Sequence, residues 1–264
     1  MSRSKTYPWI EESSLRAFNP KPDQALAPIL CALIVDPLEA EDVAKEYGLS
    51  FPHRLRDFQE LNALKGVEAA LQTAYAWASR NRYAAFAKDP WMGFLGIAQL
   101  DYRLLCWCLL SIAREPVLQT LDADDFDRET ILDAVEAWCR SGKSTDQIKQ
   151  ELREGRAMLR DRRERRDNGW RGTDQYDPRM LMAESILEAV CDVAVLSSDS
   201  RVDSAADEER EYAMLGSIVL DECANFVAFP KYKRSVSSIP TSDAKRIRMR
   251  LVRTVVDSIL TLPR

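Results

Sequence analysis

The ten residues LLCWCLLSIA at positions 104–113 contain a single polar side chain, that of Ser111. A helix over this stretch has apolar residues on every face, and such a helix is surrounded by other helices. The apolar character extends back to Trp91, while Pro90 and Glu115-Pro116 mark the two ends. We therefore predict a buried central helix over residues 92–114, with a break at Glu115-Pro116.

The rest of the chain has the spacing of amphipathic helices. Leucine, valine and alanine recur every three to four residues over 54–81. Alternating runs of β-branched residues, which mark half-buried strands, are almost absent. The sequence predicts an all-α multi-helix bundle of about eight helices around the central helix. Besides 92–114, we expect helices over 24–35, 38–47, 54–81, 128–140, 145–167, 178–197, 205–228 and 241–261.

The length of 264 residues suits one large domain with its own core. We predict a single all-α domain over 1–264, in which 1–23 form an extended arm that contains Pro8, Pro20 and Pro22. The polar linker 168–177 leaves an alternative open, a subdivision into 24–167 and 178–264.

The composition of the chain bears on its cellular location and on which classes of partner it can bind. The net charge is −5, from 37 Lys and Arg against 42 Asp and Glu, which disfavours nucleic acid as a partner. None of the six cysteines forms a C-x-x-C pair, as is typical of reduced, buried thiols. The N-terminus has no signal-peptide core, and Asp101 and Arg103 interrupt the most apolar stretch. We expect a cytoplasmic protein with no membrane contact.

The motifs that carry catalysis or bind cofactors are incomplete. His53 is the one histidine and has no partner for general base work. Ser141-Gly-Lys-Ser144 resembles the end of a phosphate loop, but Ala137 stands where the motif needs glycine. The run from Asp122 to Asp127 lacks the glycine and the final glutamate of a calcium loop. We therefore predict no catalytic residue and no cofactor, and we favour a protein that is not an enzyme.

Two charged segments are candidates for binding a partner protein. The run 122–127 is an acidic patch suited to a basic partner. The helix 145–167 has few apolar positions, and arginines interleaved with acids crowd its end, followed by Trp170 in a polar segment. Tryptophan and arginine are enriched at interaction hot spots. The predicted partner-binding residues are Asp122, Asp124, Asp125, Asp127, Arg160, Arg163, Arg166 and Trp170.

A different interpretation rests on acids at helical spacing. Glu184 and Glu188 share one helix face, and Asp221-Glu222 lie on a later helix. Paired carboxylates can hold Mg²⁺, and the pattern resembles the all-α nucleoside-triphosphate pyrophosphatases. That resemblance implies a magnesium-dependent nucleotide hydrolase. This chain departs from the family at Asn225, where a downstream acid is expected, and it has no phosphate-binding lysines on these helices.

The absence of complete catalytic motifs, together with the acidity, favours a non-enzymatic protein-binding module. The function we predict is that of a bacterial immunity or antitoxin-type protein, which neutralises a toxin or effector by direct binding. The alternatives are the magnesium-dependent hydrolase and, as a weaker one, nucleic-acid binding through the arginine-rich segment 156–171, which includes the end of the helix 145–167. Steeply salt-dependent affinity would distinguish the last of these.

Overall fold

The computed structural model describes residues 30, 32–34, 72, 91–100, 102–120, 126–141, 146–167, 178–199 and 205–260. These residues form α-helices joined by turns and include no strand, so the predicted all-α fold is confirmed. The helices are α6 (Trp91–Leu100), α7 (Tyr102–Leu118), α8 (Phe126–Ser141), α9 (Asp146–Asp167), α10 (Pro178–Asp199), α11 (Ala205–Tyr232) and α12 (Thr241–Leu260), with a short 3-10 helix η2 (Val236–Ser238) before α12.

The chain divides into two compact units, one of residues 1–101 with 261–264 and one of residues 102–260. In the first unit, α6 approaches the backbone of Leu33 at Gly93, where an added Cβ atom would lie 2.6 Å from the Leu33 side chain. The second unit contains the helices on both sides of the linker 168–177, and α10 packs against α7, α8 and α9. The single domain over 1–264 stays a prediction, as does the arm 1–23, which lies outside the described residues.

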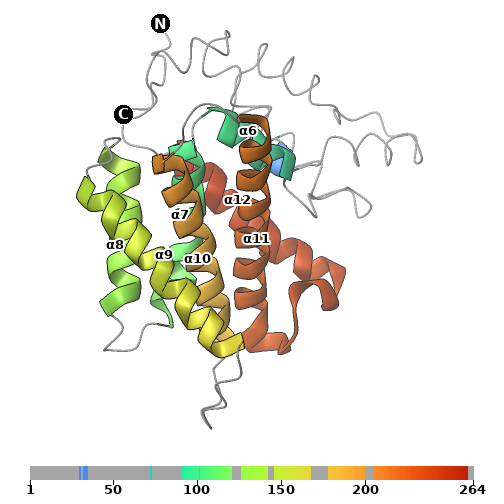
Figure 1. Cartoon of the computed structure of the whole chain (residues 1–264). Coiled ribbons are helices and arrows are strands. Elements are labelled where there is room, and N and C mark those ends of the chain that lie inside the picture. The colour runs from blue at the N-terminus through green and yellow to red at the C-terminus, as the bar shows by residue number, and fades with distance from the viewer. Residues whose placement is uncertain are drawn as a thin grey trace, which may run out of the picture. The chain divides into compact units, whose positions relative to one another are not determined.

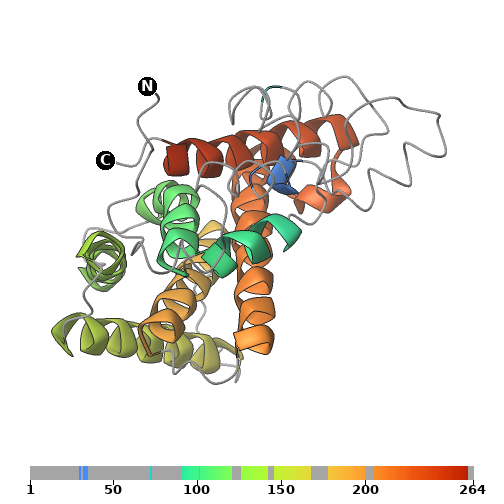
Figure 2. The same ribbon diagram turned by 90° about the horizontal axis from the view of Figure 1, so that it is seen from above.

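Two helices form the centre of the second unit. α7 contacts α8, α10, α11 and α12, while α10 contacts α7, α8, α9 and α11. α8 and α9 cover one side of this central pair, and α12 covers another (Figures 1 and 2). The apolar run 104–113 supplies most of the α7 core, in which Leu104, Leu105 and Leu109 are fully buried. The prediction that this run is surrounded by other helices is thus confirmed.

The prediction of one continuous central helix was wrong in its continuity and at its C-terminal end. α6 and α7 are separate helices within the expected 92–114, and α7 continues through Pro116 to Leu118. Proline lacks the N–H that would donate to the carbonyl four residues earlier, here that of Ile112. The Cys223 thiol of α11 donates to this carbonyl instead, at 3.5 Å. A bond from a neighbouring helix thus compensates the proline and lets the helix continue.

α11 is also longer than expected, since it passes Pro230 and ends at Tyr232. Its stretch Glu211–Tyr232 is long and apolar enough to cross a membrane, and half of its most apolar window is buried in the protein. A core helix meets the same criterion, and α11 packs on α7, α10 and α12.

A buried arginine closes the C-terminal end of α7. Arg128 of α8 is fully buried, and it donates to the carbonyl of Thr120 at 2.8 Å and to its hydroxyl at 3.3 Å. The last carbonyls of a helix lack partners within the helix, and a cation there is favoured by the helix dipole. Arg128 therefore ties α8 to the end of α7, a role that the sequence pattern does not indicate.

Candidate functional site

The acidic candidate patch lies mostly outside the described residues. This holds for Asp122, Asp124 and Asp125, and for Trp170 of the other candidate segment. Asp127 falls in the first turn of α8 and Arg166 in the last turn of α9. An acid at a helix start is favoured by the helix dipole, so the position of Asp127 also has a structural explanation.

The arginine-rich helix α9 packs on the acidic face of α10, and a ladder of ion pairs joins them. Arg163 lies 2.9 Å from Oε1 of Glu188, and Arg160 lies 3.4 Å from Asp192 and 3.9 Å from Glu188. Arg156 pairs with the same Asp192. Arg162 extends the ladder to Glu184, at 3.9 Å. Two groups of residues that the sequence presented as separate candidate sites are therefore partners of each other.

The ladder changes what these side chains offer to an external ligand. Glu188 is 8 % exposed, and it accepts a hydrogen bond from Arg163 at 3.0 Å. Charged groups with such low exposure need partners, because water no longer solvates them. α9 is therefore docked within its own chain, where Arg160, Arg162 and Arg163 balance the charges of Glu184, Glu188 and Asp192.

The second pair of acids lies apart from the ladder. Asp221 of α11 pairs with Arg248 of α12 at 2.6 Å. Burial raises the pKa of the neighbouring Glu222, while a hydrogen bond with Asn225 acts in the opposite direction. Across the part of the chain that the structure describes, no three His, Cys, Asp or Glu side chains come together as metal ligands. The structure thus does not assemble Glu184, Glu188, Asp221 and Glu222 into one centre.

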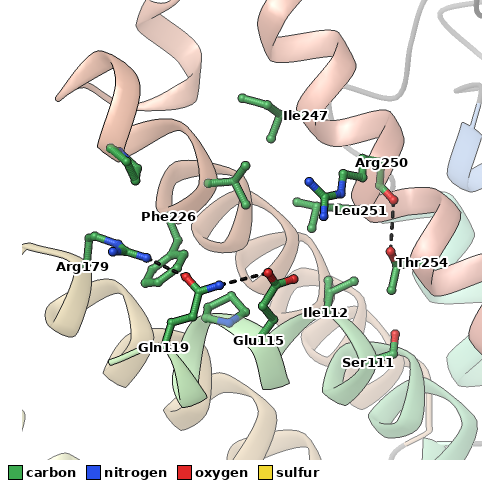
Figure 3. A pocket seen from close by; sticks show the side chains of 13 residues that line it. Ser111, Ile112, Glu115, Gln119, Arg179, Phe226, Ile247, Arg250, Leu251 and Thr254 are labelled. Carbon is green, nitrogen blue, oxygen red and sulfur yellow. Dashed lines mark hydrogen bonds between the residues drawn. The ribbon is translucent and has the colours of Figure 1, made fainter. Parts of the chain in front are cut away.

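A cleft of about 220 Å³ opens where four helices of the second unit meet (Figure 3). Its floor is apolar, with Ile112 and Phe226 buried and Leu251 nearly so. The lining residues are Ser111, Ile112, Glu115 and Pro116 of α7, Gln119 in the turn after α7, Arg179 of α10, Phe226, Val227 and Pro230 of α11, and Ile247, Arg250, Leu251 and Thr254 of α12.

A chain of polar contacts runs along one wall of the cleft. The guanidinium of Arg179 lies over the ring of Phe226, 4.3 Å from its centroid, and donates to Oε1 of Gln119 at 2.7 Å. Gln119 in turn donates to Glu115 at 3.0 Å. Figure 3 shows this chain on the α7 and α10 side, with Arg250 on the α12 side. The cation–π contact holds Arg179 against an apolar surface.

The groups in this cleft suit binding better than covalent chemistry. The Ser111 hydroxyl donates to the carbonyl of Cys108 at 2.6 Å, and that of Thr254 donates to the carbonyl of Arg250 at 3.2 Å. The lining includes no histidine or lysine, and its one carboxylate, Glu115, accepts a hydrogen bond from Gln119 while both hydroxyls donate to backbone carbonyls. The other groups that a ligand would meet in the cleft are the apolar floor, the guanidinium groups of Arg179 and Arg250, and the carboxylate of Glu115.

Sequence reasoning missed the cleft because no local pattern marks it. Arg179 is the second residue of α10, and Phe226 is one aromatic among the apolar residues of α11. Their relation to Arg250 depends on how four helices pack. The basic run of α12, with Lys245, Arg246, Arg248, Arg250 and Arg253, is the one signal that points toward this region.

Comparison with known proteins gives no further assignment: no protein-family model, no curated protein and no solved structure matches this chain.

Proposed function

We propose that this chain is a non-enzymatic protein-binding module of the immunity or antitoxin type, which neutralises a toxin or effector by direct binding. The observation that supports this best is the cleft between α7, α10, α11 and α12. It combines an apolar floor with arginines and an aromatic ring, and its two hydroxyls donate to backbone carbonyls rather than to a base. Arginine and aromatic residues are the side chains enriched at protein interfaces.

The size of the cleft also favours a protein partner. Pockets for small ligands and cofactors usually enclose about 300–1,000 Å³, whereas this cleft measures about 220 Å³. That volume suits one or two side chains of a partner. Val227 lines the cleft and is 38 % exposed, so apolar surface continues from the floor to the rim.

The charged segments enter the proposal in different ways. The acidic run 122–127 would face a basic part of the partner, and the net charge of −5 would speed its approach. Arg160 and Arg163 would have to exchange their ion pairs with α10 before they could bind a partner. The proposal includes a cytoplasmic location, where the five described cysteines, all free thiols, would stay reduced.

The test is rescue from toxicity, with two matched variants. The protein is first used to capture a partner from its host, and the captured protein is then expressed alone to establish that it arrests growth. Co-expression with the unaltered chain is expected to restore growth. Val227→Asp places a charge in the cleft and is expected to abolish rescue.

Ile218→Asp is the control, because Ile218 lies on the same helix at nearly the same exposure, 39 % against 38 %, and does not line the cleft. This variant is expected to rescue growth as the parent does. Circular dichroism establishes that both variants are folded. A captured protein that is harmless, or equal rescue by the two variants, would contradict the proposal.

A further inference from the structure

The cleft lies in a basic part of an acidic protein. Lys231, Lys233 and Arg234 follow directly on Pro230, and α12 adds Arg250. The carboxylates of this region are already engaged. Asp243 binds Tyr232 and lies 2.9 Å from Arg246 and 3.8 Å from Lys231, and Glu115 accepts a hydrogen bond from Gln119. The rim thus has more positive than negative charge, although the whole chain has a net charge of −5.

Arg250 is the cation best placed to meet a ligand. It is exposed, lines the cleft beside Leu251, and forms no ion pair within the described part of the chain. Among the side-chain hydrogen bonds of the described residues, the one that involves Arg250 uses its carbonyl, which accepts from Thr254. Arg179, on the opposite wall, is fixed by Gln119 and Phe226. An apolar group on the floor would therefore lie between a fixed arginine and one that is available.

We propose that the cleft binds an acidic amphipathic segment of the partner protein, with an apolar side chain on the floor formed by Ile112, Phe226 and Leu251, and a carboxylate at Arg250. This inference rests on the proposed function, to which it adds the chemistry of the partner. An arginine fork is suited to a carboxylate, and a buried apolar floor favours a peptide over a nucleic-acid backbone. The volume of about 220 Å³ matches one aromatic or aliphatic side chain.

The test uses small molecules that share a ring and differ in charge. The ligands are 3-phenylpropionate, its neutral amide and 3-phenylpropylamine, each titrated into the full-length ¹⁵N-labelled protein and followed by NMR. We expect 3-phenylpropionate to bind most tightly, with millimolar Kd, and to shift resonances of the residues that line the cleft. The neutral amide should bind more weakly and the amine least.

Arg250→Gln is expected to weaken 3-phenylpropionate binding about two- to five-fold, the range for an exposed ion pair, and to leave the amide unaffected. Arg246→Gln is the matched control, because Arg246 lies one turn away on α12, is 72 % exposed and does not line the cleft. The inference is overturned if all three ligands bind equally well, or if the resonance shifts occur only on other surfaces. It is also overturned if both variants lose the same affinity for 3-phenylpropionate.

Two outcomes separate this inference from the proposed function. A cleft that prefers 3-phenylpropionate, in a protein that rescues no host from toxicity, would keep the ligand chemistry and remove the immunity role. Rescue that depends on Val227, without any preference for the carboxylate ligand, would keep the immunity role and remove the ligand chemistry. Preferential binding of oligothymidylate at the same resonances, abolished by Arg250→Gln, would overturn the inference in favour of nucleic acid.

Discussion

A single glycine sets how closely α9 approaches α8. Gly155 is buried, and a Cβ atom added there would lie 2.6 Å from Cγ1 and 3.0 Å from Cδ1 of Ile131. Isoleucine is stiff at its first side-chain torsion, so it has little freedom to move aside. One turn earlier on α9, the carbonyl of Leu152 accepts a hydrogen bond from the Cys191 thiol of α10, at 3.3 Å.

Gly155→Ala is therefore expected to destabilise the protein, although alanine favours helix by about 1 kcal/mol over glycine. Overpacking of a tight contact costs about 1–3 kcal/mol. The free energy of unfolding, measured in urea for both chains, shows directly whether the substitution stabilises or destabilises the protein. In an Ile131→Ala background, where the obstructing atoms are gone, the same change should be stabilising. A stabilising Gly155→Ala in the otherwise unaltered chain would show that the contact relaxes freely.

Other single residues show where sequence reasoning stops. The candidates Arg160, Arg163, Glu184 and Glu188 were found because charge at helical spacing is visible in a sequence. Their mutual pairing was not, since helical spacing says which residues share a face and not which helix that face meets. Arg128 was missed for the same reason, because an arginine in a first helical turn normally faces water.

At the scale of elements, the ion-pair ladder is the main polar contact between α9 and α10. α9 contributes only a narrow apolar strip, with Leu152 and Leu159 buried. The acidic partners on α10 are better buried than the arginines, with Glu188 at 10 % and Arg163 at 50 % side-chain exposure. Salt screens the attraction between exposed charges more than that between buried ones. The pair of Arg163 and Glu188 is partly exposed, so salt should weaken it only in part.

A double-mutant cycle of Arg163→Gln and Glu188→Gln is expected to give a coupling energy of about 1 kcal/mol, at the upper end for exposed pairs. The control cycle uses Arg165 and Asp161, which pair within α9 at 75 % and 54 % exposure. That coupling should be about 0.3–0.5 kcal/mol. Both cycles are measured by urea unfolding in dilute buffer and in 1 M NaCl. A coupling between α9 and α10 no larger than the control would mean that the ladder contributes little to docking.

Linkers and prolines explain which helix bounds could be predicted. α9 and α10 were expected over 145–167 and 178–197 and occur at Asp146–Asp167 and Pro178–Asp199, because polar linkers bound both. α7 and α11 were predicted to end too early, since each runs past a proline. A proline usually ends a helix, and the bond from Cys223 that compensates Pro116 comes from another helix 111 residues away.

At the scale of the whole molecule, the apolar run 104–113 was sufficient to predict a helix bundle and its centre. The cleft could not be predicted, because its lining comes from helices that span residues 111–254 in the chain. The five described cysteines are distributed through the same core, and all are buried. The sequence predicted reduced, buried thiols, and the burial of these five is confirmed.

Burial raises the pKa of Cys106, Cys108, Cys191 and Cys223, and that of Cys191 reaches about 12, from an ordinary value of 9.0. The folded state therefore keeps protons that the unfolded chain releases near pH 9. Stability from these thiols is present below pH 9 and is lost as the pH rises toward about 12. Each one contributes a slope of about −1.4 kcal/mol per pH unit within that window.

Urea unfolding between pH 9 and pH 10.5 is expected to show this loss in the unaltered chain. Tyrosines and lysines titrate in the same range, so the informative comparison is with Cys191→Ala, in which their contributions are unchanged. The slope should become shallower by about 1.4 kcal/mol per pH unit in that variant. Parallel slopes would mean that Cys191 ionises in the folded protein, and hence that water reaches the interface between α9 and α10.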